Sequence, residues 1–227
     1  MATDLLEAPS LDTGDHLSRD EFLRIWECLP HIQRAELIGG IVYMPSPLWK
    51  PHGKMDRRIS TWLGVYESNT PGCEGGSNTS SLIGEDCPQP DDYLAILPEC
   101  GGASWGTKYV EGSPEFVAEV SNSSVSVDLY EKFDLYQNAR VQEYLVVLLK
   151  KREIRWHRLA KGKYKAIAPT AEGVYRSRVF PGLWLDSLAL FSDDLAQVLA
   201  TLEKGVASDE HQQFVEELAK RKRSAKK

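Results

Sequence analysis

The sequence predicts an α/β or α+β domain in which helices flank a β-sheet. Helical and strand patterns alternate along the chain, in the order helix, hairpin, helix, two strands, helix and further strands. The run 143–149 is long and apolar enough to be a central strand. A chain of 227 residues, of which 42% are hydrophobic, is also large enough for one domain with a substantial core.

The chain divides into three predicted segments. Residues 1–17 are expected to be disordered. Residues 18–190 are expected to form the main domain. Residues 191–227 are expected to add two helices and the basic tail 220–227.

The first part of the main domain predicts a helix, a hairpin and a longer helix. Ser18 and Glu21 have the spacing of a capping box, which marks the start of the first helix. Gly39-Gly40 separates two short apolar runs and therefore predicts a two-residue hairpin turn. From about 53 to 68 the apolar side chains recur with helical spacing. The outward face of this helix carries Lys54, Arg57 and Arg58.

The rest of the main domain is predicted to be mostly β-structure. One helix, at about 126–138, interrupts the strands. Strands are expected near 80–83, 91–97, 115–120, 143–149 and 153–159, with 164–168 and 175–180 continuing them as a meander.

Composition excludes several classes of protein. The net charge of −6 is not that of a protein that coats nucleic acid, although the basic tail makes the charge uneven. No apolar run approaches the ~20 residues that span a bilayer, and the acidic N-terminus does not resemble a secretory signal, so no membrane partner is expected. The four cysteines form no C-x-x-C pair, which favours reduced thiols and a cytoplasmic location.

Two acidic residues beside apolar runs are the strongest candidates for a functional site. Asp91 opens the apolar run 93–97, and Glu119 lies inside the apolar run 116–120. Burying an isolated ionised carboxylate is costly, so Glu119 needs a cation or hydrogen bonds as a partner. If the two strands pair, the carboxylates converge, and together with a backbone carbonyl they suit Mg²⁺.

Several short pieces of sequence stand in a characteristic order along residues 20–190. They are Glu36 to Pro47, His52, Pro90-Asp91, Glu119-Val120-Ser121, Asp128 with Lys132 and Tyr136, and Val141 to Tyr144. In order and spacing these pieces resemble the Uma-type family of restriction endonucleases, a branch of the PD-(D/E)XK nuclease superfamily. Each piece alone is common, and their combination carries the resemblance.

The resemblance implies a restriction-endonuclease-like fold, which is a mixed sheet with helices on both faces. It places the acid pair of the family on Asp91 and Glu119, and it implies that these carboxylates and the backbone carbonyl of Val120 hold the metal. The superfamily motif has a lysine two residues after the glutamate, where this chain has Ser121. The resemblance places the lysine at Lys132 instead, on the next helix, from which a long side chain reaches the same space.

These residues predict a metal-dependent endonuclease that hydrolyses phosphodiester bonds in DNA. Bound Mg²⁺, or Mn²⁺, lowers the pKa of water and neutralises phosphate oxygens. Lys132 is expected to orient the attacking water or to stabilise the developing negative charge. Glu36 is expected to assist from its hairpin. DNA is therefore the expected partner, and a homodimer would allow both strands to be cut.

Each of these assignments has a structural alternative. Asp91 could be a turn residue at the start of a strand, and Glu119 could form a salt bridge with an arginine. Asp128 and Lys132 have the i, i+4 spacing of a surface ion pair on a helix. For Glu36, a structural role in the hairpin is favoured over a catalytic one.

Three basic residues are candidates for contacts with the phosphates of the substrate. They are His52, at the start of a helix, and Arg57 and Arg58 on its outward face. The alternatives are a capping or solvated histidine and a solvated helix face. Neither a serine-hydrolase motif nor a phosphate-binding loop is present. The second hypothesis for the chain is therefore a catalytically inactive nuclease fold that binds nucleic acid or protein.

Overall fold

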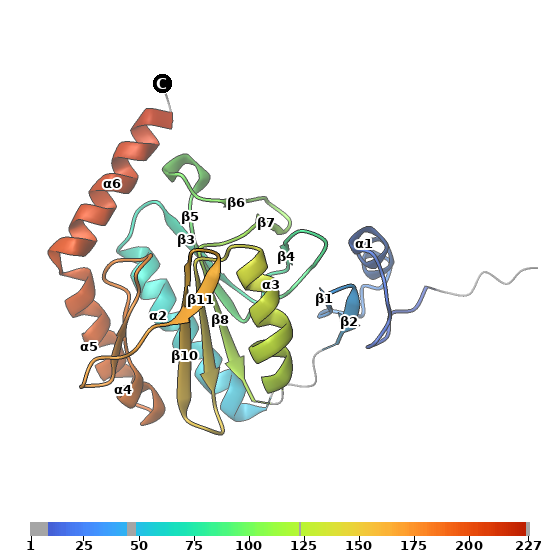
Figure 1. Cartoon of the computed structure of the whole chain (residues 1–227), viewed down its shortest axis with the longest axis horizontal. Helices are drawn as coiled ribbons and strands as arrows, with labels where there is room; N and C mark the ends of the chain where they lie inside the picture. The colour runs from blue at the N-terminus through green and yellow to red at the C-terminus, as the bar shows by residue number, and fades with distance from the viewer. Residues whose placement is uncertain (1–8, 45–48, 123, 226–227) are drawn as a thin grey trace, which may run out of the picture.

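The computed structural model describes residues 9–44, 49–122 and 124–225. Its centre is a β-sheet with helices on both faces (Figure 1). Within the described residues this sheet has six strands, in the order β11-β10-β9-β8-β5-β3. These strands are β3 (Cys73–Ser77), β5 (Asp92–Ile96), β8 (Phe116–Ser121), β9 (Glu143–Leu148), β10 (Glu153–Ala160) and β11 (Lys163–Ala166).

One pair of strands makes the sheet mixed. β8 and β9 are parallel, with Glu119 level with Val146, and the other neighbouring strands are antiparallel. A parallel pair needs a crossover connection, and α3 (Lys132–Asn138) lies in that connection. Both β8 and β9 are buried along their whole length. The predicted mixed sheet flanked by helices is confirmed, and the run that begins at 143 is a central strand.

The two faces of the sheet have separate cores. On one face, α2 packs with the C-terminal helices, and the ring of Trp62 contacts that of Phe116. On the other face, α3 and the π-helical turn η2 pack on the sheet, and Tyr136 of α3 contacts Tyr144 of β9. Successive side chains of a strand point to opposite faces, so β5, β8 and β9 contribute to both cores. The helical elements of the two faces are α2 (Lys50–Ser68), η2 (Val127–Glu131), α4 (Ser187–Phe191), α5 (Leu195–Val206) and α6 (Asp209–Ala225).

A helix and a hairpin precede α2, as predicted. Ser18 caps α1 (Arg19–Glu27) in a capping box with Glu21. Strands β1 (Glu36–Ile38) and β2 (Ile41–Tyr43) pair through the turn at Gly39-Gly40, where φ is 61° and 75°. Such values favour glycine, which explains the Gly-Gly signal.

The segment before α1 differs from the disorder expected for residues 1–17. Residues 9–17 lie along the hairpin: the Leu17 N–H donates to the Gly40 carbonyl, and the Val42 N–H donates to the Asp15 carbonyl. Leu11 is buried in a small core that it shares with side chains of α1 and the hairpin. Hydrogen bonds and burial together fix this part of the segment, and residues 1–8 lie outside the described residues.

Two smaller sheets complete the domain. Beside the main sheet lie η1 (Pro98–Cys100) and the strands β4 (Ser81–Leu82), β6 (Ser104–Trp105) and β7 (Val110–Gly112). The expected meander beyond β11 is wrong, because β12 (Val174–Arg176) pairs with β13 (Trp184–Asp186) and not with the main sheet. The Arg176 guanidinium stacks over the Trp184 ring at 3.9 Å, which joins this hairpin across its own strands.

The C-terminal extension consists of helices, as the sequence predicts. Phe214 and Leu218 of α6 bury their side chains in the core on the α2 side. Beyond this contact α6 projects from the body of the molecule (Figure 1). Part of the basic tail, residues 226–227, lies outside the described residues. Among the described helices, none is long and apolar enough to cross a membrane.

Candidate active site

Strand pairing brings the two predicted acids together. β5 and β8 are antiparallel, and Asp92 pairs with Ala118, so Asp91 comes level with Glu119. Asp91 lies just before β5, and its Oδ2 accepts a hydrogen bond from the backbone N–H of Val120 at 2.7 Å. His52 Nε2, from the first turn of α2, lies 3.5 Å from the same oxygen. Asp91 is therefore held by a neighbouring strand and by a helix.

Glu119 is held from the helix that follows it. The Nζ of Lys132 donates to Glu119 Oε1 at 2.9 Å, and the hydroxyl of Tyr136 donates to the same oxygen at 3.2 Å. Lys132 and Tyr136 are four residues apart on α3, so both side chains reach the sheet from one side of the helix. Lys132, and not an arginine, is thus the cation that pairs with Glu119.

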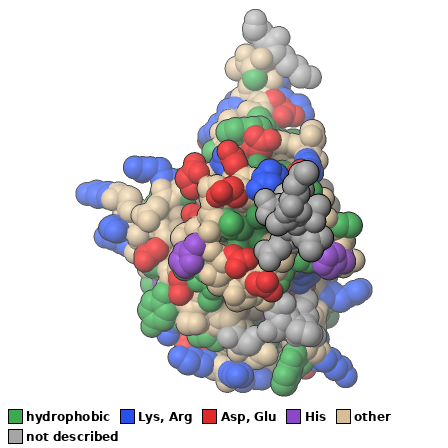
Figure 2. Space-filling model, turned by 90° about the vertical axis from the view of Figure 1, so that its right-hand side faces the viewer, with side chains coloured by type: hydrophobic (Ala, Val, Ile, Leu, Met, Phe, Trp, Pro, Cys, Tyr) green, Lys and Arg blue, Asp and Glu red, His purple; other side chains and the backbone are tan. Residues whose placement is uncertain are grey.

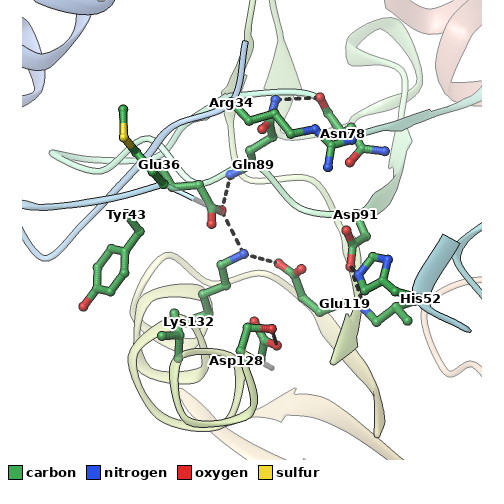
Figure 3. A pocket seen from close by; sticks show the side chains of 14 residues that line it. Arg34, Glu36, Tyr43, His52, Asn78, Gln89, Asp91, Glu119, Asp128 and Lys132 are labelled. Carbon is green, nitrogen blue, oxygen red and sulfur yellow. Dashed lines mark hydrogen bonds and ion pairs between the residues drawn. The ribbon is translucent and has the colours of Figure 1, made fainter. Parts of the chain in front are cut away.

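The hairpin supplies a second carboxylate to Lys132. Its Nζ lies 2.8 Å from Glu36 Oε1, and the backbone N–H of Gln89 donates to that oxygen at 2.6 Å. The ammonium group therefore bridges β1 and β8, which are far apart in the sequence. Figure 3 shows the side chains of Glu36, Lys132 and Glu119 in this arrangement.

Asp128 faces the pocket from η2 and is not part of a surface ion pair. Its side chain is only 2% exposed, and the Ser124 hydroxyl donates to its Oδ2 at 2.5 Å. The Tyr144 hydroxyl donates to the Asp128 carbonyl at 2.9 Å. The i, i+4 pairing of Asp128 with Lys132 at the surface, one of the sequence alternatives, is therefore wrong, because both side chains are buried and Lys132 binds Glu36 and Glu119 instead.

Burial and crowding of acids control the protonation of the site. Burial raises the pKa of Glu119 well above its ordinary value; the charge of Lys132 opposes this, and the carboxylates of Asp91, Asp128 and Glu36 add to it. Burial lowers the pKa of Lys132, but the surrounding carboxylates outweigh burial and raise it well above its ordinary value. Lys132 therefore stays charged, and the site holds more acidic groups than Lys132 can neutralise.

These residues line one pocket of about 230 Å³. Asp91, Glu119 and Asp128 lie on one side of it, and Arg34 lies on another, near Asn78 (Figure 3). Val120 and His52 also line the pocket. Of the residues that the sequence predicts for the site, the structure thus brings together Glu36, His52, Asp91, Glu119, Val120 and Lys132.

The free oxygens of the acid pair suit a hard cation. Within the described residues, both hydrogen-bond contacts to Asp91 use Oδ2 and both to Glu119 use Oε1, which leaves Oδ1 and Oε2 without such a contact. Carboxylate oxygens are the ligands that Mg²⁺ takes from proteins, with water filling the other positions. The described side chains contain no group of three or more His, Cys, Asp or Glu arranged to hold a metal. Two carboxylates are fewer ligands than Mg²⁺ takes, so a metal held by this acid pair would keep several waters.

Two predicted substrate contacts do not lie in the pocket. The Arg58 side chain is only 10% exposed, and its Nη1 donates to Asp193 Oδ1 at 2.6 Å. The predicted position of Arg58 on the outward face is therefore wrong. Its side chain is buried and ties α2 to the turn between α4 and α5. Lys54 pairs with the same Asp193 at 2.6 Å, and Arg57 is exposed outside the pocket.

Ser121 stands where the superfamily motif has lysine, and Lys132 supplies the amine. Ser121 is buried two residues after Glu119 on the same strand. A serine side chain there cannot provide an ammonium group. The ammonium group comes from α3, where Lys132 Nζ lies 2.9 Å from Glu119 Oε1.

Sequence reasoning missed roles for Tyr136, Gln89 and Arg34. The spacing of Tyr136 from Lys132 was a usable signal, because residues four apart share a helix face. Arg34 lies two residues before Glu36, and alternation along an extended chain places both on one side. The Gln89 contact is made by its backbone N–H, so no side-chain pattern could have shown it.

A comparison with known protein families decides the family of the chain. The family model Uma2, described as "Putative restriction endonuclease", matches residues 19–190. The chain belongs to the Uma2 family. This confirms the predicted resemblance, and the matched range nearly coincides with the predicted main domain. No curated protein matches the sequence.

A solved structure shares the fold of this Uma2 protein. It is the crystal structure of a protein from Anabaena variabilis described as a "putative nuclease belonging to DUF820". The two chains superpose with a TM-score of 0.60 at 14% sequence identity, over 78% of this chain and 98% of the other. At this identity the likeness supports the fold of the domain, and the family match supports a nuclease.

Proposed function

We propose that this Uma2 protein is a metal-dependent endonuclease that hydrolyses phosphodiester bonds in DNA. One observation carries the proposal: Asp91 and Glu119 face one pocket from paired strands, with Lys132 Nζ 2.9 Å from Glu119. An acid pair with an adjacent amine is what phosphodiester hydrolysis needs for holding a metal and stabilising charge. The family match supports nuclease chemistry in general.

Asp91, Glu119 and the backbone carbonyl of Val120 would hold Mg²⁺ or Mn²⁺. Bound there, the metal would neutralise phosphate oxygens and lower the pKa of a water molecule. The contacts from Val120 N–H and His52 fix the Asp91 carboxylate. This pre-organisation matters because ligands already in place lose less freedom when a metal or substrate binds.

Lys132 and Glu36 would act next to the acid pair, from α3 and from the hairpin. The Lys132 ammonium can stabilise negative charge as it develops on the phosphate, because its pKa is raised and it stays charged. Glu36 and Glu119 hold that ammonium from two directions. Glu36 would therefore position Lys132 without contacting the substrate. This role is structural for Glu36 itself and supports catalysis through Lys132.

Plasmid cleavage tests the proposal. Purified protein with Mg²⁺ or Mn²⁺ is expected to nick or cut plasmid DNA. Asp91→Asn and Glu119→Gln keep the shape of each side chain but remove its charge, and we expect cleavage to fall by about 10²-fold or more. The matched control is Asp134→Asn, an exposed acid on α3, which is expected to cut like the wild type.

Two results would contradict the proposal. One is equal cleavage by Asp91→Asn and the wild type. The other is no cleavage of single- or double-stranded DNA by folded wild-type protein with either metal. That second result, together with DNA binding measured by fluorescence anisotropy, would favour the inactive nuclease fold. Circular dichroism establishes that each variant is folded.

A further inference from the structure

Arg34 brings a guanidinium group without a partner into the acidic pocket. It lines the pocket together with Asp91 and Glu119, and it is half-buried. Among the described residues, none forms a hydrogen bond or an ion pair with its side chain. A guanidinium carries five N–H donors in a fixed fork. These donors are therefore available to an acceptor that enters the pocket.

The carboxylate nearest to Arg34 in the sequence is already engaged. Glu36, two residues further on, binds Lys132 at 2.8 Å and the backbone N–H of Gln89 at 2.6 Å. Glu119 pairs with the same lysine at 2.9 Å. Lys132 is thus fixed by acids of the chain itself, whereas the Arg34 guanidinium is left for an anion from outside.

Asn78 places further donors beside Arg34. Figure 3 shows the Arg34 guanidinium next to the Asn78 side chain. The Asn78 N–H donates to the Asp91 carbonyl at 2.9 Å, and the Asn78 carbonyl accepts from the Gln89 side chain at 2.9 Å. These bonds hold its backbone at a φ of 52°, a left-handed value that asparagine tolerates. No residue that the structure describes bonds to its side-chain amide, which is therefore held ready beside the guanidinium.

The two cations of the pocket act on different acids. Burial raises the pKa of Asp56 on α2, and the charge of Arg34 is one of those that oppose this rise. Burial also raises the pKa of Glu119, and there the opposing cation is Lys132. This division suits a substrate that carries successive phosphates, one at the acid pair and the next at Arg34.

We propose that Arg34 and Asn78 bind the phosphate next to the scissile one and so set the register of the DNA strand in the pocket. The inference rests on the proposed function, which defines the scissile phosphate. A guanidinium binds two phosphate oxygens through parallel N–H donors, and asparagine side chains are common donors to phosphates. Contacts of this kind fix register without reading sequence. They would also offset the repulsion between the strand and the acids of the pocket.

DNA binding tests the Arg34 contact without cleavage. Fluorescence anisotropy of a fluorescein-labelled duplex is measured with the full-length protein in Ca²⁺, which takes oxygen ligands as Mg²⁺ does. Arg34→Gln is expected to weaken binding by about tenfold or more. It should also reduce the slope of log affinity against log salt by about 0.9, the value for one phosphate contact. Arg34→Lys should keep the slope, because it keeps the charge, and lose part of the affinity with the fork.

Two matched controls accompany the test. Arg24→Gln removes the same charge from an exposed position on α1 outside the pocket, and it is expected to bind DNA like the wild type. Asn78→Asp keeps the shape and tolerates the left-handed φ, but its charge repels a phosphate, so binding should weaken by about tenfold or more. Asn138→Asp, at the exposed end of α3, is its control and should bind normally. Circular dichroism establishes that each variant is folded.

Single-turnover cleavage separates this contact from the proposed chemistry. Because Arg34 contributes to binding, Arg34→Gln should lose cleavage at low DNA concentration and regain most of it at saturation. A fall of about 10²-fold that persists at saturation would place Arg34 at the scissile phosphate and overturn the proposal. Wild-type affinity and salt slope in Arg34→Gln would overturn it too, and would leave the nuclease intact. If the wild type binds DNA without cutting it while Arg34→Gln loses affinity and slope, the phosphate contact stands and the nuclease fails. Wild-type protein that does not bind DNA would overturn both.

Discussion

At the scale of single residues, one ammonium group organises the pocket. Lys132 Nζ lies 2.8 Å from Glu36 and 2.9 Å from Glu119, so it links the hairpin to the central sheet. Tyr136 donates a further hydrogen bond to Glu119 at 3.2 Å. Removing the ammonium leaves buried carboxylates unpaired, whereas removing the hydroxyl leaves the ion pairs intact.

Lys132→Met and Tyr136→Phe separate these two contributions. We expect Lys132→Met to lower the single-turnover rate of DNA cleavage by about 10²-fold or more, because it removes charge stabilisation. Tyr136→Phe is expected to have a smaller effect, of about tenfold, because Glu119 loses one hydrogen bond to its carboxylate, worth about 1.5 kcal/mol, but keeps its ion pair with Lys132. Wild-type cleavage by folded Lys132→Met would rule out the assigned role of the lysine.

Several of these residues could be predicted from the sequence, and others could not. Asp91 and Glu119 stand out because acids beside or inside apolar runs need partners. The choice of Lys132 came from family resemblance, since its spacing on the helix fits a surface pair equally well. Arg58 was misplaced because its partner, Asp193, is distant in sequence and has φ of 68°, a left-handed conformation that no helical pattern indicates.

At the scale of elements, the sequence predicts which helices and strands form better than it predicts where they begin and how they pair. α2 begins at Lys50, several residues before the predicted start, and includes a proline in its first turn. Proline is tolerated there because the first N–H groups of a helix have no partner within the helix. The missed pairing of β12 with β13 depends on which strand edge is free, and alternation within one strand does not contain that information.

The contact between α2 and Asp193 predicts that replacing Arg58 destabilises the protein, whereas replacing the adjacent Arg57 does not. Arg58→Gln is expected to lower the free energy of unfolding by about 1 kcal/mol, because it removes a charged hydrogen bond at a partly exposed partner. Arg57→Gln, at an exposed position, is the matched comparison and is expected to leave stability unchanged. Urea unfolding measures both; equal midpoints for the two variants would show that Arg58 does not hold α2.

At the scale of the whole molecule, the basic end of α6 lies far from the acidic pocket. Asp91 precedes β5, whereas η1 follows it, about 23 Å away along the extended chain. The basic end of α6 lies at η1, where Lys222 contacts Glu99 at 3.2 Å. On the face in Figure 2, acidic side chains gather towards the middle and Lys and Arg lie mostly nearer the edges. DNA would therefore need a cation at the acids before its phosphates approach them.

Burial of Glu143 makes the stability of the molecule depend on pH. This β9 residue accepts hydrogen bonds from Trp156, Ser177, and the backbone N–H groups of Arg178 and Val179, and so joins the main sheet to the C-terminal part. Burial is the main cause that raises its pKa from 4.5 to about 6. Glu143 therefore binds a proton more tightly in the folded state than in the unfolded state. The stability that this proton contributes is lost as the pH rises from 4.5 through about 6.

The expected change can be measured by denaturation at several pH values. One pKa unit corresponds to about 1.4 kcal/mol, so the contribution of Glu143 to the free energy of unfolding should fall by about 2 kcal/mol in total as the pH rises from well below 4.5 to well above 6. In Glu143→Gln this decrease should be absent, whatever the overall stability of the variant. Glu203→Gln, at an exposed position on α5, should keep the wild-type slope. A wild-type slope in Glu143→Gln would assign the pH dependence to other groups.

The π-helical turn η2 accommodates one extra residue before Lys132. The Lys132 N–H bonds to the Val127 carbonyl, five residues back, so the turn holds one residue more than an α-helix would. In either kind of helix the bonded residue lies about one turn further on, so deleting the exposed Tyr130 would close the turn to an α-helix with Lys132 still directed at the acids. Such a chain is expected to keep its circular dichroism spectrum and its cleavage of plasmid DNA, and loss of cleavage would show that the wide turn itself is needed. A single codon could therefore be gained or lost at this turn without redirecting the amine that faces the acid pair.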